Sequence, residues 1–121
     1  MMTFTQDMLI GVLDGTNEVE VTTETPAGVT RTLSRLTVVN ADSVSHSITL
    51  QIYWPLDGND DRVVDTHTVR PAITIKSGES AVFRGYSCRE KMFFRVYSDA
   101  VATDSEGEPT FVCVWGDLTD P

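Results

Sequence analysis

Two acidic segments hold the residues best suited to bind a metal ion. In residues 57–61 (DGNDD), oxygen ligands alternate along the chain beside a glycine, which suits a calcium ion. However, the bidentate glutamate of a calcium loop does not follow, and Gly58 is at the wrong position for an EF-hand. Residues 104–108 (DSEGE) have the same shortcomings. We therefore interpret both segments as solvated loops rather than calcium sites, and we expect no metal and no cofactor.

No side chains in the sequence have the spacing of a catalytic site. His46 and His67 are the two histidines, and neither adjoins a nucleophile motif or a cysteine at metal-ligand spacing. We interpret both as surface or strand-end residues, and we predict that the protein is not an enzyme. Cys113 lies in an apolar run, which predicts a buried thiol. Cys88, between a serine and an arginine, is typical of a turn; a single disulfide between the two cysteines stays open.

The aromatic residues could form a platform for a sugar or for another protein. Trp54 and Trp115 continue the apolar faces of their segments, so we expect both to fill the core. Tyr53 and Tyr97 point to the opposite faces, where they would lie at the surface or at an interface. A carbohydrate-binding module therefore remains an alternative function, because it needs aromatic side chains exposed on one sheet face.

The net charge of the chain limits the classes of partner that it is expected to bind. A formal net charge of -9 and a pI of about 4.4 argue against binding to nucleic acid or to an anionic membrane. The apolar run at residues 8–13 is too short for a signal peptide and follows an aspartate, so we expect synthesis in the cytoplasm. Two cysteines do not make a disulfide scaffold, which agrees with a reducing compartment.

Charge is also unevenly distributed along the chain. Residues 1–28 contain five acidic residues and no lysine or arginine. Four basic residues occur close together later in the chain, at Arg84, Arg89, Lys91 and Arg95. The simpler interpretation is ordinary solvated charge. The functional one is that an acidic N-terminal arm docks on this basic segment, in a neighbouring copy of the chain, as exposed strand edges allow.

Short runs of β-branched and aromatic residues, separated by turn residues, must position all these side chains. About eight strands are predicted, and no segment has sustained helical periodicity. They are expected near residues 8–13, 18–22, 30–40, 48–54, 68–76, 81–83, 91–98 and 110–115. Residues 14–17 (DGTN) predict a turn, and residues 86–90 a crossover. We therefore predict an all-β antiparallel sandwich, either jelly-roll-like or immunoglobulin-like, at residues 29–121, preceded by an acidic arm or hairpin at residues 1–28.

Several of these segments together resemble small virion proteins of tailed bacteriophages. The resemblance lies in a strand ending in Asn at residues 32–40, a Thr-containing partner strand at 47–52, an Ile-x-x-Gly-Glu turn within 73–80 and an amphipathic strand at 93–98. It spans roughly residues 27–117 and implies a protein similar to capsid decoration, or cement, proteins. Members of this group bind other virion proteins and catalyse nothing.

The resemblance implies a structural role on the surface of a capsid. We expect a homo-oligomer that binds the major capsid protein or other virion proteins and stabilises the assembled head. A head–tail connector or a tail component is the alternative within the same class. The expected contact residues are in the N-terminal arm and in one later loop: Phe4, Met8, Leu9, Ile10, Arg89 and Lys91.

Overall fold

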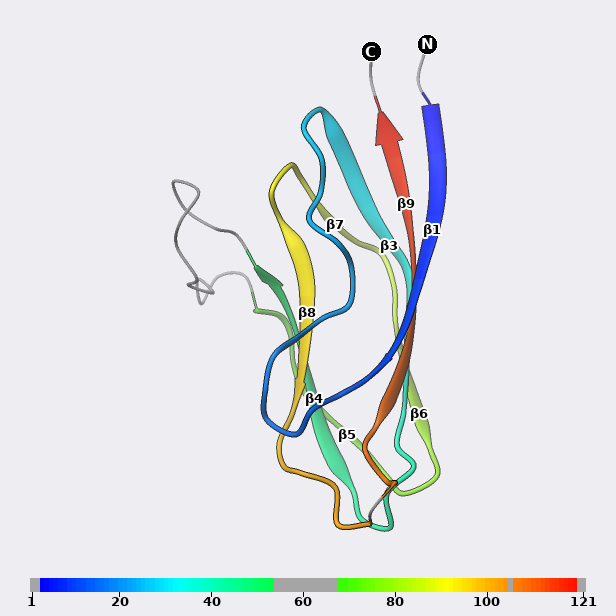
Figure 1. Ribbon diagram of the computed structural model, residues 1–121, viewed down its shortest axis with the longest axis vertical. Coiled ribbons are helices and arrows are strands. Elements are labelled where there is room, and N and C mark those ends of the chain that lie inside the picture. Colours follow the sequence, from blue (N-terminus) through cyan, green and yellow to red (C-terminus); the bar gives the residue numbers. More distant parts are fainter. Residues whose placement is uncertain (1–2, 54–67, 105, 120–121) are drawn as a thin grey trace.

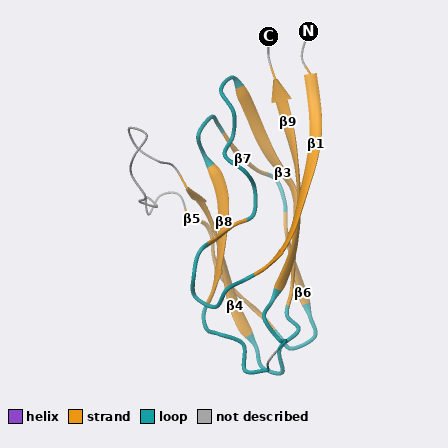
Figure 2. Cartoon of the chain, in the orientation of Figure 1, coloured by secondary structure: helices purple, strands orange, loops and turns teal. Residues whose placement is uncertain are grey.

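The chain folds into two antiparallel sheets that face each other, as the computed structural model shows (Figure 1). It describes residues 3–53, 68–104 and 106–119. This part of the chain has nine strands and no helix (Figure 2). The strands are β1 (Thr3–Val12), β2 (Val19–Glu20), β3 (Val29–Val39), β4 (His46–Tyr53), β5 (Thr68–Ile75), β6 (Ser80–Phe83), β7 (Tyr86–Cys88), β8 (Phe93–Ser98) and β9 (Thr110–Thr119). The predicted all-β antiparallel sandwich is confirmed.

The order of the strands is that of a jelly roll. One sheet has the order β1-β9-β3-β6, with β7 also paired to β3, and the other has the order β2-β8-β4-β5. Only two residues separate β6 from β7, and both pair with β3, so they act as one interrupted strand. Counted in this way, each sheet has four strands, as in a jelly roll, whereas an immunoglobulin constant domain divides seven strands four to three.

The core lies between the sheets and consists of alternate side chains from both. Leu50 and Phe94 of the four-stranded sheet are fully buried, and they belong to the same apolar cluster as Trp115 of β9. β9 lies between β1 and β3, as predicted for a central strand. Only one of its faces is fully covered, however, because Val112 and Val114 on the opposite face are half-buried. In the sequence, residues 110–115 are apolar on both faces, which predicts a central strand covered on both sides; the cover is complete on one side.

An arginine lies inside this core. Arg31 of β3 is buried and donates two hydrogen bonds of 2.8 Å to the Asp117 carboxylate of β9. Its guanidinium lies 5.1 Å from the centre of the Trp115 ring, and Nη1 donates to the carbonyl of Thr23. A buried cation needs this complete set of partners because desolvation is costly. The cluster joins β3, β9 and the segment that follows β2.

Residues 1–28 contribute one strand to each sheet. β1 pairs with β9 over its whole length, and β2 pairs with β8 in the opposite sheet. Between them, the Asn17 amide donates to the Asp14 carbonyl at 2.9 Å, which forms the predicted turn. The division of the chain at residue 28 into an acidic arm or hairpin and a sandwich domain stays a prediction.

The segment predicted as a crossover at residues 86–90 is partly a strand. β7 pairs with β3, and this pairing buries Cys88, which we had expected in a turn. The turn follows at once: the Met92 amide donates to the Arg89 carbonyl at 3.0 Å. Lys91 in this turn has a φ of 70°, a left-handed conformation that is unusual for a residue with a side chain. Both cysteines are free and buried, so the open disulfide is not formed.

Candidate interaction surface

Apolar side chains cross the outer face of the five-stranded sheet, the face turned away from the core. Strand register places them in rows that span four strands. Two adjacent rows are Ile10–Val112–Thr37–Val82 and Val12–Thr110–Val39–Ser80. A third row begins with Met8 opposite Val114. Phe4 extends the surface, since its ring lies over Gly116.

Six exposed apolar side chains define this surface, which we call the outer apolar face. They are Phe4, Met8, Ile10, Val12, Val39 and Val82. Nine large apolar side chains are exposed in the described part of the chain, so two thirds of them share one face. Ile10 and Phe4 are each 64% exposed. Contiguous apolar patches of this kind mark sites where proteins bind partners.

The five-stranded sheet is also electrically neutral. Its strands contain two arginines, Arg31 and Arg35, and two aspartates, Asp7 and Asp117, which sum to zero. The net charge of -9 of the whole chain therefore comes from residues outside this sheet. A partner that docks on the outer apolar face is not repelled by local charge, and it does not need to be basic.

Two shallow hollows interrupt the surface beside the apolar rows. They share Gln6 and Val114 as lining residues. Asp7 and Met8 complete one hollow, and Ser34, Arg35 and Arg84 complete the other. The second lies where the register of β3 with β9 shifts between Leu33 and Arg35. The face is thus uneven, with two arginines at the edge of its apolar part.

The predicted contact residues of β1 divide between its two sides. Phe4, Met8 and Ile10 belong to the outer apolar face, whereas Leu9 points the opposite way, opposite Cys113. Sequence reasoning missed the contributions of Val12, Val39 and Val82. The alternation along β1 could have revealed Val12, but Val82 joins the face only through strand pairing. The assignment of these residues to a contact remains a prediction.

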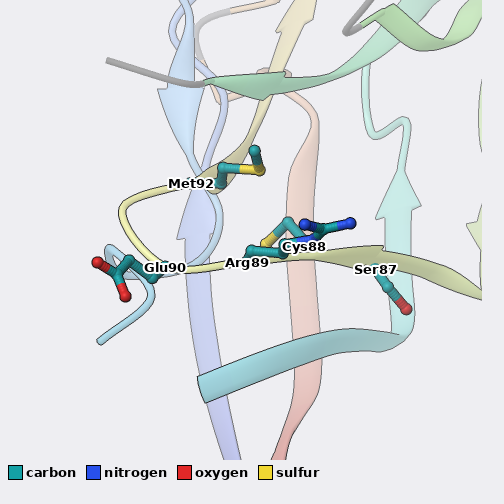
Figure 3. A pocket seen from close by; sticks show the side chains of 5 residues that line it. All are labelled: Ser87, Cys88, Arg89, Glu90 and Met92. Atoms are coloured by element: carbon teal, nitrogen blue, oxygen red, sulfur yellow. The ribbon is translucent and has the colours of Figure 1, made fainter. Parts of the chain in front are cut away.

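Arg89 and Lys91, the other predicted contacts, belong to the connection between β7 and β8. Arg89 helps to line a third hollow, together with Ser87, Cys88, Glu90 and Met92 (Figure 3). Burial raises the pKa of the Cys88 thiol, and a hydrogen bond with Thr25 offsets part of this shift. The thiol is therefore neutral and poorly reactive at pH 7.

The basic residues predicted as one patch are separated by the fold. Arg84 follows β6 in the five-stranded sheet, whereas Arg95 is in β8 of the other sheet. Arg95 does meet an acid of the N-terminal segment within the same chain, since its Nη2 lies 2.7 Å from Glu18 Oε2. Its guanidinium also lies 4.6 Å from the centre of the Tyr53 ring. Tyr53, expected at the surface or at an interface, is buried, and the centre of its ring lies 4.7 Å from that of the tilted Phe93 ring.

A buried histidine forms the most concentrated polar cluster in the described part of the chain. His46 is the first residue of β4, so the predicted strand-end place is confirmed, but it is 2% exposed and does not lie at the surface. Its Nε2 lies 2.7 Å from Asp42 Oδ2, and its Nδ1 lies 3.0 Å from Asp99 Oδ1. The Asp42 carboxylate also accepts hydrogen bonds from the amide and hydroxyl of Thr103, at 2.9 and 2.7 Å. The cluster therefore ties the β3–β4 loop to the β8–β9 loop.

The protonation states follow from this geometry. Burial lowers the pKa of His46, but its hydrogen bonds to Asp42 and Asp99 outweigh burial and raise it overall. Burial raises the pKa of Asp42, and the bonds from His46 and Thr103 bring it far below its usual range. The pKa of Asp99 is lowered for the same reason. The cluster thus favours the imidazolium form of His46, which lies between two carboxylates.

The composition of this cluster resembles that of a Ser-His-Asp triad, but its geometry does not support that chemistry. Ser98 Oγ lies 3.2 Å from His46 Nδ1, yet Ser98 is buried and its hydroxyl donates to Asp99. Carboxylates occupy both ring nitrogens, so His46 has no free nitrogen to accept a proton from serine. We interpret the cluster as a structural cross-link between two loops.

Some sequence predictions lie outside the described residues. Trp54, His67 and the acidic segment at 57–61 are among them. Among the described residues, no group of three or more histidine, cysteine or acidic side chains is arranged to hold a metal ion. No helix in the described part of the chain is long and apolar enough to span a membrane.

Comparisons with known proteins identify the fold. No protein-family model matches the sequence, and no curated protein matches it. Among solved structures, the chain is similar to one in the crystal structure of the T13 infectious bursal disease virus particle, with a TM-score of 0.55 and 9% identity over 98% of this chain. Chains of the Gx and Gt strains of the same virus give TM-scores of 0.53 and 0.52, with 9% and 8% identity over 98% of this chain. The chain spans about a third of the length of these proteins, covering 31% to 33% of them.

Proposed function

We propose that this protein is a structural component of a virus particle, and that it docks on the assembled head and reinforces it. The observation that carries the proposal is the outer apolar face, because its Ile10, Met8 and Phe4 are left exposed by the described part of the chain. The jelly-roll topology supports it, since viral capsid domains commonly use this fold. The likeness to chains of infectious bursal disease virus supports the fold part of this argument.

Docking would stabilise the head by mass action. A protein that binds the assembled shell but not its separated subunits shifts the equilibrium toward the shell. Burying one exposed isoleucine or phenylalanine contributes about 1.5–3 kcal/mol per copy. Many copies on a symmetric shell would multiply this small contribution. The partner is then the major capsid protein or another head protein.

The experiment measures how many copies of the protein each particle contains. We expect quantitative mass spectrometry of purified particles to find hundreds of copies, removable without loss of shell shape. About a dozen copies or fewer would instead indicate a head–tail connector or a tail component. Absence from every particle would overturn the virion proposal and favour the sugar-binding alternative.

A matched pair of variants tests the face itself. Ile10→Lys places a charge on the outer apolar face, and Val44→Lys makes the same kind of change at an exposed position in the β3–β4 loop. We expect Ile10→Lys to weaken co-sedimentation with stripped heads by about 10- to 100-fold, because roughly 1.5–3 kcal/mol of burial is lost. Val44→Lys should bind like the unmodified protein. Equal binding by both variants would show that docking uses another surface.

A further inference from the structure

β1 is an edge strand with an open side. It pairs with β9 on one side, and no other described element makes more than slight contact with it. In Figure 1, β1 lies at the rim of the five-stranded sheet, beyond β9. Of the usual protections of an exposed edge, its ten residues contain no proline, no lysine and no bulge, and one charged residue, Asp7. The edge is therefore free to pair with another strand.

The hydrogen-bond pattern shows which residues face that open side. Leu13, which continues the ladder, donates its amide to the Pro109 carbonyl at 2.8 Å. Bonded pairs alternate along an antiparallel ladder, so the odd-numbered residues of β1 bond to β9. The amides and carbonyls of the even-numbered residues point outward. In agreement with this pattern, the Met8 amide does not bond to β9 but donates to the neighbouring Asp7 carboxylate at 2.8 Å.

The same even-numbered residues carry the apolar side chains. Phe4, Met8, Ile10 and Val12 therefore direct their backbone groups to the open edge and their apolar side chains to the outer apolar face. The Met8 amide would exchange the Asp7 carboxylate for a carbonyl of the added strand. A strand added here gains hydrogen bonds and apolar contacts together. A second β1 offers the identical set, and the sheet to which it belongs has no net charge.

One antiparallel register satisfies the whole edge. If Met8 faces Met8 of a second copy, then Phe4 faces Val12 and Gln6 faces Ile10, so all five even-numbered residues form bonded pairs. A register centred on Asp7 sets two carboxylates directly opposite each other. A register centred on Leu9 leaves Phe4 without a partner within β1. Only the register centred on Met8 pairs all five even-numbered residues and also keeps Asp7 opposite Leu9 of the other copy.

We propose that two copies of this chain join edge to edge through β1, around a two-fold axis at Met8. The two five-stranded sheets then form one continuous sheet, and the two outer apolar faces become one surface. This proposal does not rest on the virion role, because it concerns the isolated chain. Asp7 limits the association, since the two Asp7 side chains are diagonal neighbours across the joint.

Cross-linking of single-cysteine additions tests the register. Bonded partners in an antiparallel pair have Cα atoms about 5.5 Å apart, within the range of a disulfide. We expect Met8→Cys to form a covalent dimer under mild oxidation. Gln6→Cys and Ile10→Cys should cross-link when mixed, and each alone should not. Val44→Cys is the control for random collision of exposed thiols, and the native Cys88 and Cys113 are buried.

Proline tests the hydrogen bonds without disturbing the fold. Ile10→Pro removes an outward amide that β9 does not use, so β1 should stay in the sheet. We expect sedimentation equilibrium to show dimer dissociation constants raised at least about tenfold by Ile10→Pro and lowered by Asp7→Asn. A monomer at all concentrations, cross-linking of Met8→Cys no faster than Val44→Cys, or equal cross-linking by Gln6→Cys alone would each overturn the proposal.

Discussion

His46 makes the stability of this sandwich depend on pH. It is buried between Asp42 and Asp99, and both of its ring nitrogens face carboxylate oxygens. A neutral imidazole can donate from only one nitrogen, so the other contact becomes unfavourable when the proton leaves. The favourable form is therefore the cation, and its pKa is raised.

The sign of the pH effect follows from the direction of that shift. Because the pKa of folded His46 is raised above 6.5, its contribution is complete below pH 6.5 and is lost as the pH rises through the folded pKa. The lowered pKa of Asp42 and Asp99 gives stability that is present above pH 4 and lost in acid. We expect urea unfolding to show greatest stability at about pH 5–6.5 and a decline above that range.

Substitution of each histidine provides the control. His46→Gln should flatten the decline above pH 6.5 and lower stability below it. His67, which the sequence alone predicts at the surface or at a strand end, should give a His67→Gln variant with the profile of the unmodified protein. If the decline persists in His46→Gln, another group causes it, and the proposed imidazolium is wrong.

Sequence reasoning could not have found this cluster. Asp42 and His46 are four residues apart, but Asp99 and Thr103 come from a loop more than fifty residues later. Contacts between two loops leave no pattern in the sequence, because residues in irregular segments do not repeat with the period of a helix or a strand. Arg31 was missed for a related reason: its partner Asp117 is known only once β3 is paired with β9.

At the scale of elements, the alternation of apolar and polar residues was sufficient to predict the positions of most strands. β3, β8 and β9 occur close to their predicted positions, because one face of each is buried and a shift by one residue would expose it. β7 was missed because three residues are too few for an alternating pattern to be recognised. β1 begins earlier than the predicted run, since four of its first five residues are polar and are held by pairing with β9.

Two glycines at the joint between β1 and β9 test how tightly these strands pack. A Cβ at Gly11 would stand 2.7 Å from Phe111 Cζ, and a Cβ at Gly116 would stand 2.4 Å from Phe4 Cζ. The Phe111 ring is buried in the core and cannot move away, whereas the Phe4 ring can turn into solvent. We expect Gly11→Ala to lower the free energy of unfolding by about 1–3 kcal/mol, and Gly116→Ala by less than about 1 kcal/mol.

Urea denaturation of the two variants measures this difference. Equal losses would mean that Phe4 is fixed in place as firmly as Phe111. In that case the outer apolar face would be a rigid surface rather than one with a movable ring.

At the scale of the whole molecule, the two cysteines report on cooperative unfolding. Cys88 and Cys113 belong to the same sheet and are both buried. Burial raises the pKa of Cys113 to about 12, with Arg31 acting in the opposite direction, and burial also raises that of Cys88. Both thiols are therefore protonated and covered in the folded state, where reagents reach them poorly.

We expect a thiol reagent at pH 8 to label the native protein at least about a thousandfold more slowly than the urea-unfolded protein, as a stability of several kcal/mol implies. Both thiols should react at one common rate if the sandwich opens as a unit. The Cys113→Ala variant isolates the reaction of Cys88. Faster labelling of Cys88 would show that β7 opens separately from the rest of the sheet, contrary to this expectation.

Thr3 and Thr119 are register partners in the β1–β9 pair, so the start of β1 and the end of β9 lie at the same end of the sandwich (Figure 1). A bridge of a few residues could join them and make the polypeptide a closed ring. Cut at an exposed turn such as that at Gly78, this ring would become a circular permutant with every strand contact retained. The jelly roll is therefore defined by a cyclic order of strands, and the same packing allows a chain to begin at any of several strands.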